Sequence, residues 1–187
     1  MHGTGAASDW VSRWTPACPA GARALDLACG GGRHLRWLAA QGWSVTGVDR
    51  DETALRGLQG LGELIHADLE GGAWPLEGRQ FDLVVVTHYL WRPLWPALLG
   101  ALAPGGLLIY ETFADGQQAI GRPSRPAFLL QPGELLQACA GLRVLGYENG
   151  LLAEPLRCVQ RIAAAHDADR PASQARWTLP AWTEALG

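Results

Sequence analysis

Short apolar runs alternate with amphipathic stretches along most of the chain. Unbroken or alternating apolar positions predict strands, and apolar positions at helical spacing predict helices. Strands are predicted at 24–29, 44–49, 63–67, 81–87, 106–113, 142–148 and 156–164, and helices at 34–41, 52–58, 91–102 and from about 132. This alternation is typical of βαβ units, so it predicts a parallel sheet that is covered by helices on both faces.

The last two predicted strands are separated by Asn149-Gly150 and a short loop, which favours a hairpin and therefore an antiparallel last strand. The expected fold class is α/β, with a Rossmann-like, doubly wound sheet of seven mostly parallel strands. The length predicts a single domain over residues 1–187. Its expected parts are an N-terminal helix and linker at 1–21, a Rossmann-like core at 23–165 and a C-terminal tail at 166–187.

Composition disfavours several classes of protein. The chain has 187 residues, of which 48% are hydrophobic and 18% are charged, and no apolar run approaches the roughly 18–20 residues of a membrane span. Fifteen basic residues, none of them lysine, stand against 18 acids, and the net charge of −3 disfavours binding to nucleic acid. The four cysteines form no CxxC pair and the N-terminus lacks a signal-peptide pattern. We therefore expect a cytoplasmic protein that needs no metal and does not enter a membrane.

Three consecutive glycines join the first predicted strand to the first long helix. Gly30 and Gly32 permit tight backbone turns and let a ligand approach a helix N-terminus without meeting a Cβ atom. The segment fails as a dinucleotide fingerprint, because Leu35 stands where that motif needs glycine or alanine. Counted from Asp26, the pattern is instead Asp-x-Ala28-x-Gly-x-Gly.

Acidic residues end the next two strands. Asp49 lies where a doubly wound fold places a carboxylate that accepts both hydroxyls of a ribose, and Asp68 follows the third strand. Together with the glycine segment, these residues resemble class I S-adenosylmethionine-dependent methyltransferases, in which a glycine stands at the position of Ala28. The resemblance extends over residues 23–165. The Cys-Gly-x-Gly-Arg segment and Tyr110-Glu-Thr-Phe resemble the small enzymes related to tellurite-resistance methyltransferases.

The resemblance implies that S-adenosylmethionine is the cofactor and that its methyl group is transferred to a small-molecule acceptor by in-line displacement. The cofactor-binding residues that it implies are Asp26, Ala28, Gly30, Gly32, Asp49, Arg50, Asp68, Leu69 and Thr87. Such a chemistry depends mainly on alignment of the acceptor and exclusion of water, so a dedicated base is needed only for a hydroxyl acceptor.

The acceptor pocket is expected over the carboxyl ends of the fourth and fifth strands. His88 and Tyr89 are the candidate catalytic residues, because a histidine there has a pKa suited to a general base. The alternative is that both side chains only shape the end of the strand. Tyr110 and Glu111, at the end of the fifth strand, are candidates for substrate binding.

The polar loop at 114–126 is too long for a plain connection, so it is a candidate lid. Its Arg122 and Arg125 are expected to bind an anionic substrate, unless they belong to a solvated surface loop. Cys29 has no acid or histidine placed by the sequence to activate it, so we expect a packed thiol.

Two other functions stay open on the sequence alone. One is a protein that binds S-adenosylmethionine without catalysis. The other is an NAD(P)-linked oxidoreductase, which the failed fingerprint disfavours. The expected partner is a small-molecule methyl acceptor, and the expected state is a monomer or homodimer.

Overall fold

The computed structural model describes residues 5–18, 22–167 and 177–180. Its seven strands are β1 (Arg23–Leu27), β2 (Ser44–Asp49), β3 (Glu63–His66), β4 (Phe81–Thr87), β5 (Leu102–Phe113), β6 (Arg143–Ala153) and β7 (Leu156–Ala165). The helices are α1 (Asp9–Trp14), α2 (Arg33–Ala40), α3 (Glu52–Arg56), α4 (Trp95–Gly100) and α5 (Glu134–Ala138). Short 3-10 turns lie at η1 (Thr15–Ala17), η2 (Arg92–Leu94), η3 (Gln117–Ala119) and η4 (Pro126–Phe128). The rest of the predicted linker and tail, at 1–4, 19–21, 168–176 and 181–187, lies outside the described residues.

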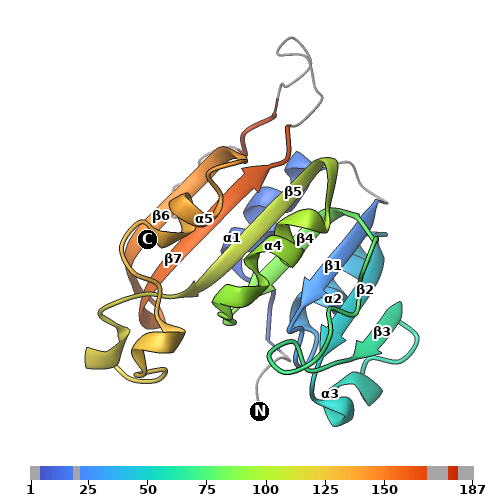
Figure 1. Ribbon diagram of the computed structural model, residues 1–187, viewed down its shortest axis with the longest axis horizontal. Coiled ribbons are helices and arrows are strands. Elements are labelled where there is room, and N and C mark those ends of the chain that lie inside the picture. The colour runs from blue at the N-terminus through green and yellow to red at the C-terminus, as the bar shows by residue number, and fades with distance from the viewer. Residues whose placement is uncertain (1–4, 19–21, 168–176, 181–187) are drawn as a thin grey trace.

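The strands form one sheet in the order β3-β2-β1-β4-β5-β7-β6 (Figure 1). The first five strands pair in parallel, whereas β7 runs antiparallel to both β5 and β6. The chain order reverses between β1 and β4, so the carboxyl ends of these two strands flank the crevice where doubly wound sheets bind ligands. The predicted fold class, including the antiparallel last strand, is confirmed.

Helices cover both faces of the sheet, which explains why the central strands are apolar on both sides. On one face, a core cluster contains Trp10 of α1, Leu38 of α2 and Leu55 of α3. On the other face, a second cluster contains Leu98 of α4 and Leu135 of α5. Figure 1 shows α1 and α2 behind the sheet and α4 and α5 in front of it.

The closing hairpin turns later than the sequence predicted. Asn149 and Gly150 lie inside β6, paired with residues of β7, and the turn falls at Glu154-Pro155. Proline lacks the N–H that an antiparallel ladder needs, so Pro155 ends the strand where the Asn-Gly pair does not.

The helix predicted at 91–102 is also shorter than expected. Pro93 and Pro96 restrict it to η2 and the six-residue α4, because proline fits the first turn of a helix but not its interior. β5 begins at Leu102, earlier than the strand predicted at 106–113, so Pro104 lies within it, where the β4–β5 register shifts between Phe81 and Leu83. This irregularity accommodates the extra residues of β5 without ending the strand.

Candidate functional site

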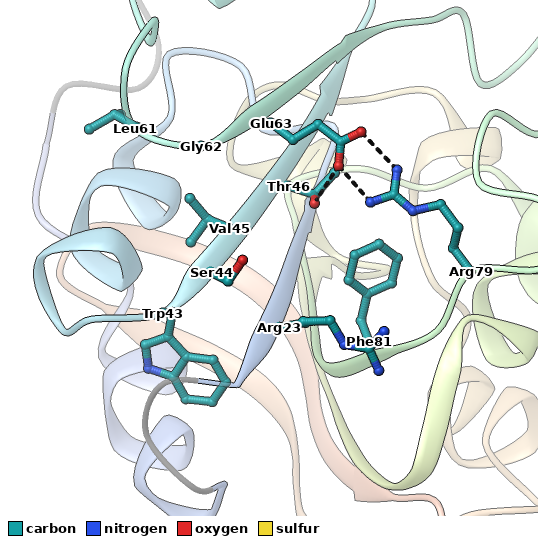
Figure 2. A pocket seen from close by; sticks show the side chains of 10 residues that line it. All are labelled: Arg23, Trp43, Ser44, Val45, Thr46, Leu61, Gly62, Glu63, Arg79 and Phe81. Atoms are coloured by element: carbon teal, nitrogen blue, oxygen red, sulfur yellow. Dashed lines mark hydrogen bonds and ion pairs between the residues drawn. The ribbon is translucent and has the colours of Figure 1, made fainter.

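A pocket at the amino ends of β1, β2 and β3 lies on the edge opposite to the predicted site (Figure 2). Its charged side chains are already paired. Glu63 accepts two hydrogen bonds from Arg79 at 2.5 and 2.9 Å, and these hydrogen bonds lower the pKa of Glu63. Arg23 lies 3.6 Å from Asp82. We therefore assign this pocket a structural role and turn to the carboxyl edge.

The glycine loop between β1 and α2 takes a left-handed backbone conformation at every second residue. Ala28, Gly30 and Gly32 have φ angles of 55°, 51° and 72°. A Cβ atom at Gly30 would meet no atom within 4 Å, so this residue faces open space. At Gly32 a Cβ atom would lie 2.5 Å from Leu58, so its small size serves packing rather than ligand approach. Gly30 therefore leaves room beside the backbone and Gly32 does not, while the role of both glycines in cofactor binding stays a prediction.

Asp49 connects the end of β2 to this loop. Its Oδ2 accepts a hydrogen bond from the Gly30 N–H at 2.6 Å, and its Oδ1 accepts one from the Asp51 N–H at 2.8 Å. The side chain is largely buried, with 9% of the residue surface exposed. A carboxylate has about four lone-pair sites, so these two bonds leave capacity for further donors. The fold thus places the predicted ribose acid directly beside the glycine loop.

Asp26 lies beneath the loop rather than in the open crevice. Its carboxylate is buried and accepts a hydrogen bond from the Leu35 N–H at 3.1 Å, in the first turn of α2. Burial raises the pKa of Asp26 to about 7. Burial also raises the pKa of the Cys29 thiol, as expected for a packed cysteine. Asp26 is therefore placed to hold α2 against β1 and only indirectly to shape a ligand site.

Three predicted cofactor residues follow β2 and β3. Asp68 is exposed, and its Oδ1 accepts a hydrogen bond from the Glu70 N–H at 3.0 Å. Leu69 is buried in the core cluster beneath it. Arg50 is exposed, and its carbonyl oxygen lies 3.0 Å from Nε2 of His66. Arg50 and Asp68 are thus exposed just beyond the ends of β2 and β3, whereas Leu69 belongs to the core.

Tyr89 follows β4 and is half-buried. Its hydroxyl oxygen is buried and has no hydrogen-bond partner among the described residues. Burial, followed by the nearby charges of Glu70 and Asp68, raises the pKa of Tyr89. The hydroxyl is therefore protonated at neutral pH, and it faces the acids of the predicted cofactor side. This makes Tyr89 suited to donate a hydrogen bond and unsuited to act as a base.

His88 has a left-handed φ of 54° and an exposed side chain. Its ring stacks on Phe113 at a centroid distance of 5.0 Å. Its backbone N–H donates to the Glu111 carbonyl at 2.9 Å. The end of β4 is thus tied to the end of β5. The structure places His88 at the carboxyl edge, where the acceptor site was predicted.

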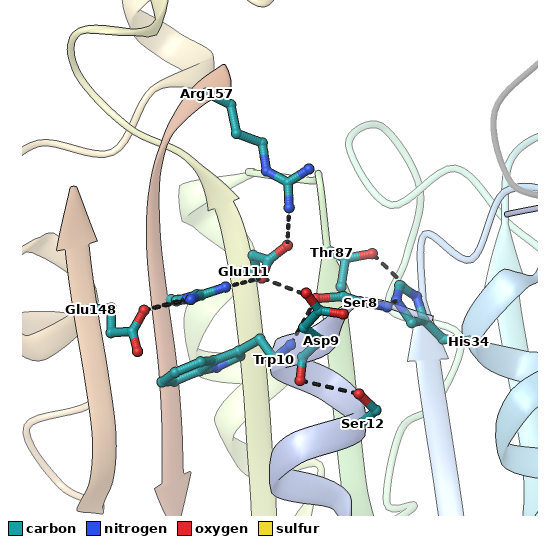
Figure 3. Close-up of polar contacts among 10 residues, drawn as sticks. Ser8, Asp9, Trp10, Ser12, His34, Thr87, Glu111, Glu148 and Arg157 are labelled. Atoms are coloured by element: carbon teal, nitrogen blue, oxygen red, sulfur yellow. Dashed lines mark hydrogen bonds and ion pairs between the residues drawn. The ribbon is translucent and has the colours of Figure 1, made fainter. Parts of the chain in front are cut away.

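Ser8, just before α1, connects the N-terminal segment to the ends of β4 and β5 (Figure 3). Its N–H donates to Nε2 of His34 at 3.1 Å, and its hydroxyl donates to the Glu111 carboxylate at 3.0 Å. Because Nε2 accepts, Nδ1 of His34 carries the hydrogen and faces the Thr87 hydroxyl at 3.4 Å. Burial lowers the pKa of His34 to about 3, so the imidazole stays neutral.

Ser8 and His34 were missed by the sequence analysis, although each carries a recognisable signal. Ser8 precedes an acidic residue and an apolar helical pattern, as N-cap residues do, and its hydroxyl accepts from the Trp10 N–H. His34 follows the glycine segment directly. Their pairing was not predictable, because nothing local in the sequence brings the two together.

Tyr110 and Glu111 do not line an open acceptor pocket, which corrects the prediction for both. Tyr110 is 2% exposed, and its hydroxyl donates to the Tyr89 carbonyl at 2.6 Å. Glu111 is fully buried and contacts Ser8, Arg157 and Arg161. Both faces of β5 are covered, so its alternating side chains are enclosed on either side.

The predicted lid carries two exposed arginines, Arg122 and Arg125. Within the described residues, no carboxylate lies within ion-pair distance of either guanidinium group. The base of the loop is fixed by the buried side chain of Gln117, which contacts the Arg122 carbonyl and the Cys158 N–H. The mobility and the substrate role of this loop stay predictions.

Within the described residues, no group of three or more histidine, cysteine, aspartate or glutamate side chains could hold a metal ion. No helix in this part of the chain is both long and apolar enough to span a membrane.

Part of the chain matches a known protein family and a relative from that comparison. Residues 24–106 match a family described as a methyltransferase domain. The chain is also similar to a ubiquinone biosynthesis O-methyltransferase from Aromatoleum aromaticum, with 36% identity over 117 residues. This match covers 56% of the chain and 48% of the relative, so the chain spans about half the length of that protein.

Solved structures share the fold at low sequence identity. TehB from Haemophilus influenzae matches with a TM-score of 0.69 and 20% identity, over 87% of this chain and 63% of that one. An S-adenosylmethionine-dependent methyltransferase from Mesorhizobium loti matches with a TM-score of 0.64 and 22% identity, over 85% and 98% of the two chains. These matches show that the chain shares the fold of these proteins.

Proposed function

Because residues 24–106 belong to a methyltransferase domain family and the chain has the fold of class I S-adenosylmethionine-dependent methyltransferases, we propose that it is a methyltransferase. In this proposal it transfers the methyl group of S-adenosylmethionine to a small-molecule acceptor. The comparisons do not name that acceptor for this chain.

The hydrogen bond from the Gly30 N–H to the Asp49 carboxylate is the observation that carries the proposal. It brings an acid for the ribose hydroxyls to Gly30, whose Cβ position opens into free space. The buried hydroxyl of Tyr89, which lacks a partner among the described residues, supplies an unused donor on the same side. These groups fit the polar atoms of a nucleoside-containing cofactor.

When bound, S-adenosylmethionine supplies a methyl group that its sulfonium already activates for in-line displacement. The chain's task is then to fix the ligand, align the acceptor and exclude water. In this proposal, Asp49 would accept hydrogen bonds from the ribose hydroxyls, and Asp68 would hold the adenine amino group. Thr87, whose hydroxyl accepts from His34, keeps its own hydrogen available for the ligand.

His88 is placed to take a proton where the acceptor is a hydroxyl, since its exposed ring lies at the end of β4 against Phe113. A thiolate, amine or oxyanion acceptor needs no base, and His88 then only shapes the site. Tyr89 is better suited to donate a hydrogen bond than to catalyse, because its raised pKa keeps the hydroxyl protonated.

Calorimetric titration with S-adenosylmethionine, S-adenosylhomocysteine and NAD tests the proposal. We expect the first two ligands to bind at one site per chain and NAD to bind at least tenfold more weakly. Tight binding of NAD alone would overturn it in favour of an oxidoreductase. Binding of S-adenosylmethionine without S-adenosylhomocysteine release across thiol, amine and phenol acceptors would favour a binding protein without catalysis.

Two further expectations belong to this proposal. The four cysteines are free thiols, three of them buried, which suits a reducing compartment such as the cytoplasm. We also propose that the chain acts as a monomer or homodimer on a small acceptor. Gel filtration with light scattering tests the oligomeric state.

A further inference from the structure

Charged side chains from four elements meet on the α1 face of the sheet. Glu111 of β5 contacts both Arg157 and Arg161 of β7. Glu148 of β6 contacts Arg161, and Arg13 of α1 lies 3.7 Å from Glu148. Among the described residues, this cluster joins three guanidinium groups to two carboxylates. It therefore carries one positive charge that no carboxylate of the cluster balances.

Of the two arginines on β7, Arg161 is the better paired. Arg161 lies 2.5 Å from the Glu148 carboxylate, and its guanidinium covers the ring of Trp10 at 4.8 Å. Among the described residues, the polar partner of Arg157 is the Glu111 carboxylate, which lies 3.5 Å from Nη2. Hydrogen bonds between charged groups are normally near 2.8 Å, so this contact is weak.

Arg157 also has a buried Nε–H without a partner among the described residues. An unsatisfied buried donor is costly to stability, so its presence needs a reason. The side chain is not closed off, because 20% of its surface is exposed. An anion arriving from solvent can therefore reach this guanidinium and balance its charge.

The position of Arg157 relates it to the predicted acceptor site. β7 pairs antiparallel with β5, with Val159 opposite Phe113, so Arg157 lies just beyond the carboxyl end of β5. Side chains alternate along a strand, which puts Arg157, Val159 and Phe113 on one face. Figure 3 shows Arg157 above Glu111, with Thr87 and His34 to the right of Glu111. The ring of His88 stacks on Phe113 at the same edge.

We propose that Arg157 recognises the methyl acceptor by binding a carboxylate on a small, planar molecule that packs beside Phe113 and His88. This inference rests on the proposed methyltransferase function and names the chemical class of its acceptor. The planar guanidinium fork suits a carboxylate, and the partly buried setting strengthens the attraction. Arg122 and Arg125 lack this setting, because both are exposed.

Benzoate and its neutral analogue benzamide are the probes for the test, titrated calorimetrically into the complex with S-adenosylhomocysteine. The wild type should bind benzoate at least about tenfold more tightly than benzamide. Arg157→Gln should remove this preference, whereas Arg157→Lys should keep part of it by retaining the charge without the fork. Arg56→Gln, which alters an exposed helical ion pair in α3, is the matched control and should keep the preference.

The thermal midpoint separates recognition from a structural role. Arg157→Gln removes the unbalanced charge, so its midpoint should equal or exceed that of the wild type, whereas a structural arginine would lower it. Two outcomes would overturn the inference: no preference for benzoate in the wild type, or a preference that survives in Arg157→Gln and disappears in the Arg122→Gln/Arg125→Gln double variant. Absence of S-adenosylhomocysteine binding in the wild type would instead overturn the proposed function.

Discussion

The two sides of the carboxyl edge are assembled by different means. On the β1–β2 side, Asp26 and Asp49 accept hydrogen bonds from backbone N–H groups 9 to 19 residues away. On the β5–β7 side, Glu111 meets Ser8 across 103 residues and Arg157 across 46. One side is held by backbone groups of a single βαβ unit, and the other by side chains that meet only in the finished fold.

This difference predicts where each side is vulnerable. Backbone donors cannot be removed by substitution, so the β1–β2 side should respond to changes in its carboxylates. The β5–β7 side depends on the N-terminal segment, because Ser8 reaches both His34 and Glu111. Four predictions, from the largest expected effect to the smallest, test this contrast.

Asp26→Asn should change how stability depends on pH. The pKa of Asp26 is about 7 when folded and about 3.9 when unfolded, so the folded state binds more protons between these values. The wild type should therefore lose up to about 4 kcal/mol of unfolding free energy as the pH rises from about 4 to 7. The Asp26→Asn variant should lack this loss. Urea unfolding at pH 4.5 and pH 8 measures this difference. An equal loss in both proteins would contradict the buried carboxylate.

Asp49→Ala should weaken binding of S-adenosylhomocysteine by about 3 kcal/mol, or roughly 100-fold. The substitution deletes the proposed ribose acceptor and also releases the Gly30 N–H, which shapes the loop. Calorimetry measures the affinity, and circular dichroism checks the fold. Asp9→Ala, an exposed acid on α1, is the control and should bind normally. Unchanged affinity in Asp49→Ala would remove Asp49 from the cofactor site.

His34→Leu should lower the unfolding free energy by about 2 kcal/mol at pH 7, because it leaves the Ser8 N–H without its acceptor in a buried position. Ser12→Ala is the control, since it changes a partly exposed hydroxyl in α1, the helix that Ser8 precedes. Urea unfolding measures both variants. A loss no larger than in the control would show that the N-terminal segment is held by apolar packing alone.

His34→Leu should also change how stability depends on pH, in the direction opposite to Asp26→Asn. The pKa of His34 is about 3 when folded against about 6.5 when unfolded, so the unfolded state binds more protons between these values. This residue therefore makes stability fall as the pH drops from about 6.5 to 3, opposite in sign to Asp26. His34→Leu should be less sensitive to acid than the wild type.

The fold was predictable because it depends on patterns that repeat within each βαβ unit. The bounds of β2 and β4 agree with the apolar runs, since covered strands are apolar throughout. The turn of the β6–β7 hairpin was not predictable, because Asn149-Gly150 favours a turn locally while the β7 ladder holds both residues in a strand. There, tertiary pairing outweighs local preference.

The site divides in the same way. The position of Asp49 beside the glycine loop was predictable, because an acid at the end of the strand that follows such a loop is a local pattern. Ser8, His34 and Arg157 were not, because their contacts depend on how α1 and β7 pack against the ends of β4 and β5. Tyr110 and Glu111 were assigned to an open pocket because the sequence does not show that both faces of β5 are covered.

Ala28→Gly gives the smallest expected effect and tests the β1–β2 side at its backbone. Ala28 has a left-handed φ of 55°, which costs an ordinary residue roughly 1–2 kcal/mol, whereas glycine adopts it freely. Glycine loses more entropy on folding, so the net gain in unfolding free energy should be about 1 kcal/mol. Ala39→Gly, inside helix α2, is the matched control and should be destabilising by about 1 kcal/mol, because its backbone gains nothing from the added freedom. Urea unfolding measures the change in unfolding free energy of both variants and shows whether the two changes have opposite signs. Destabilisation at both positions would show that the loop stores no strain at Ala28.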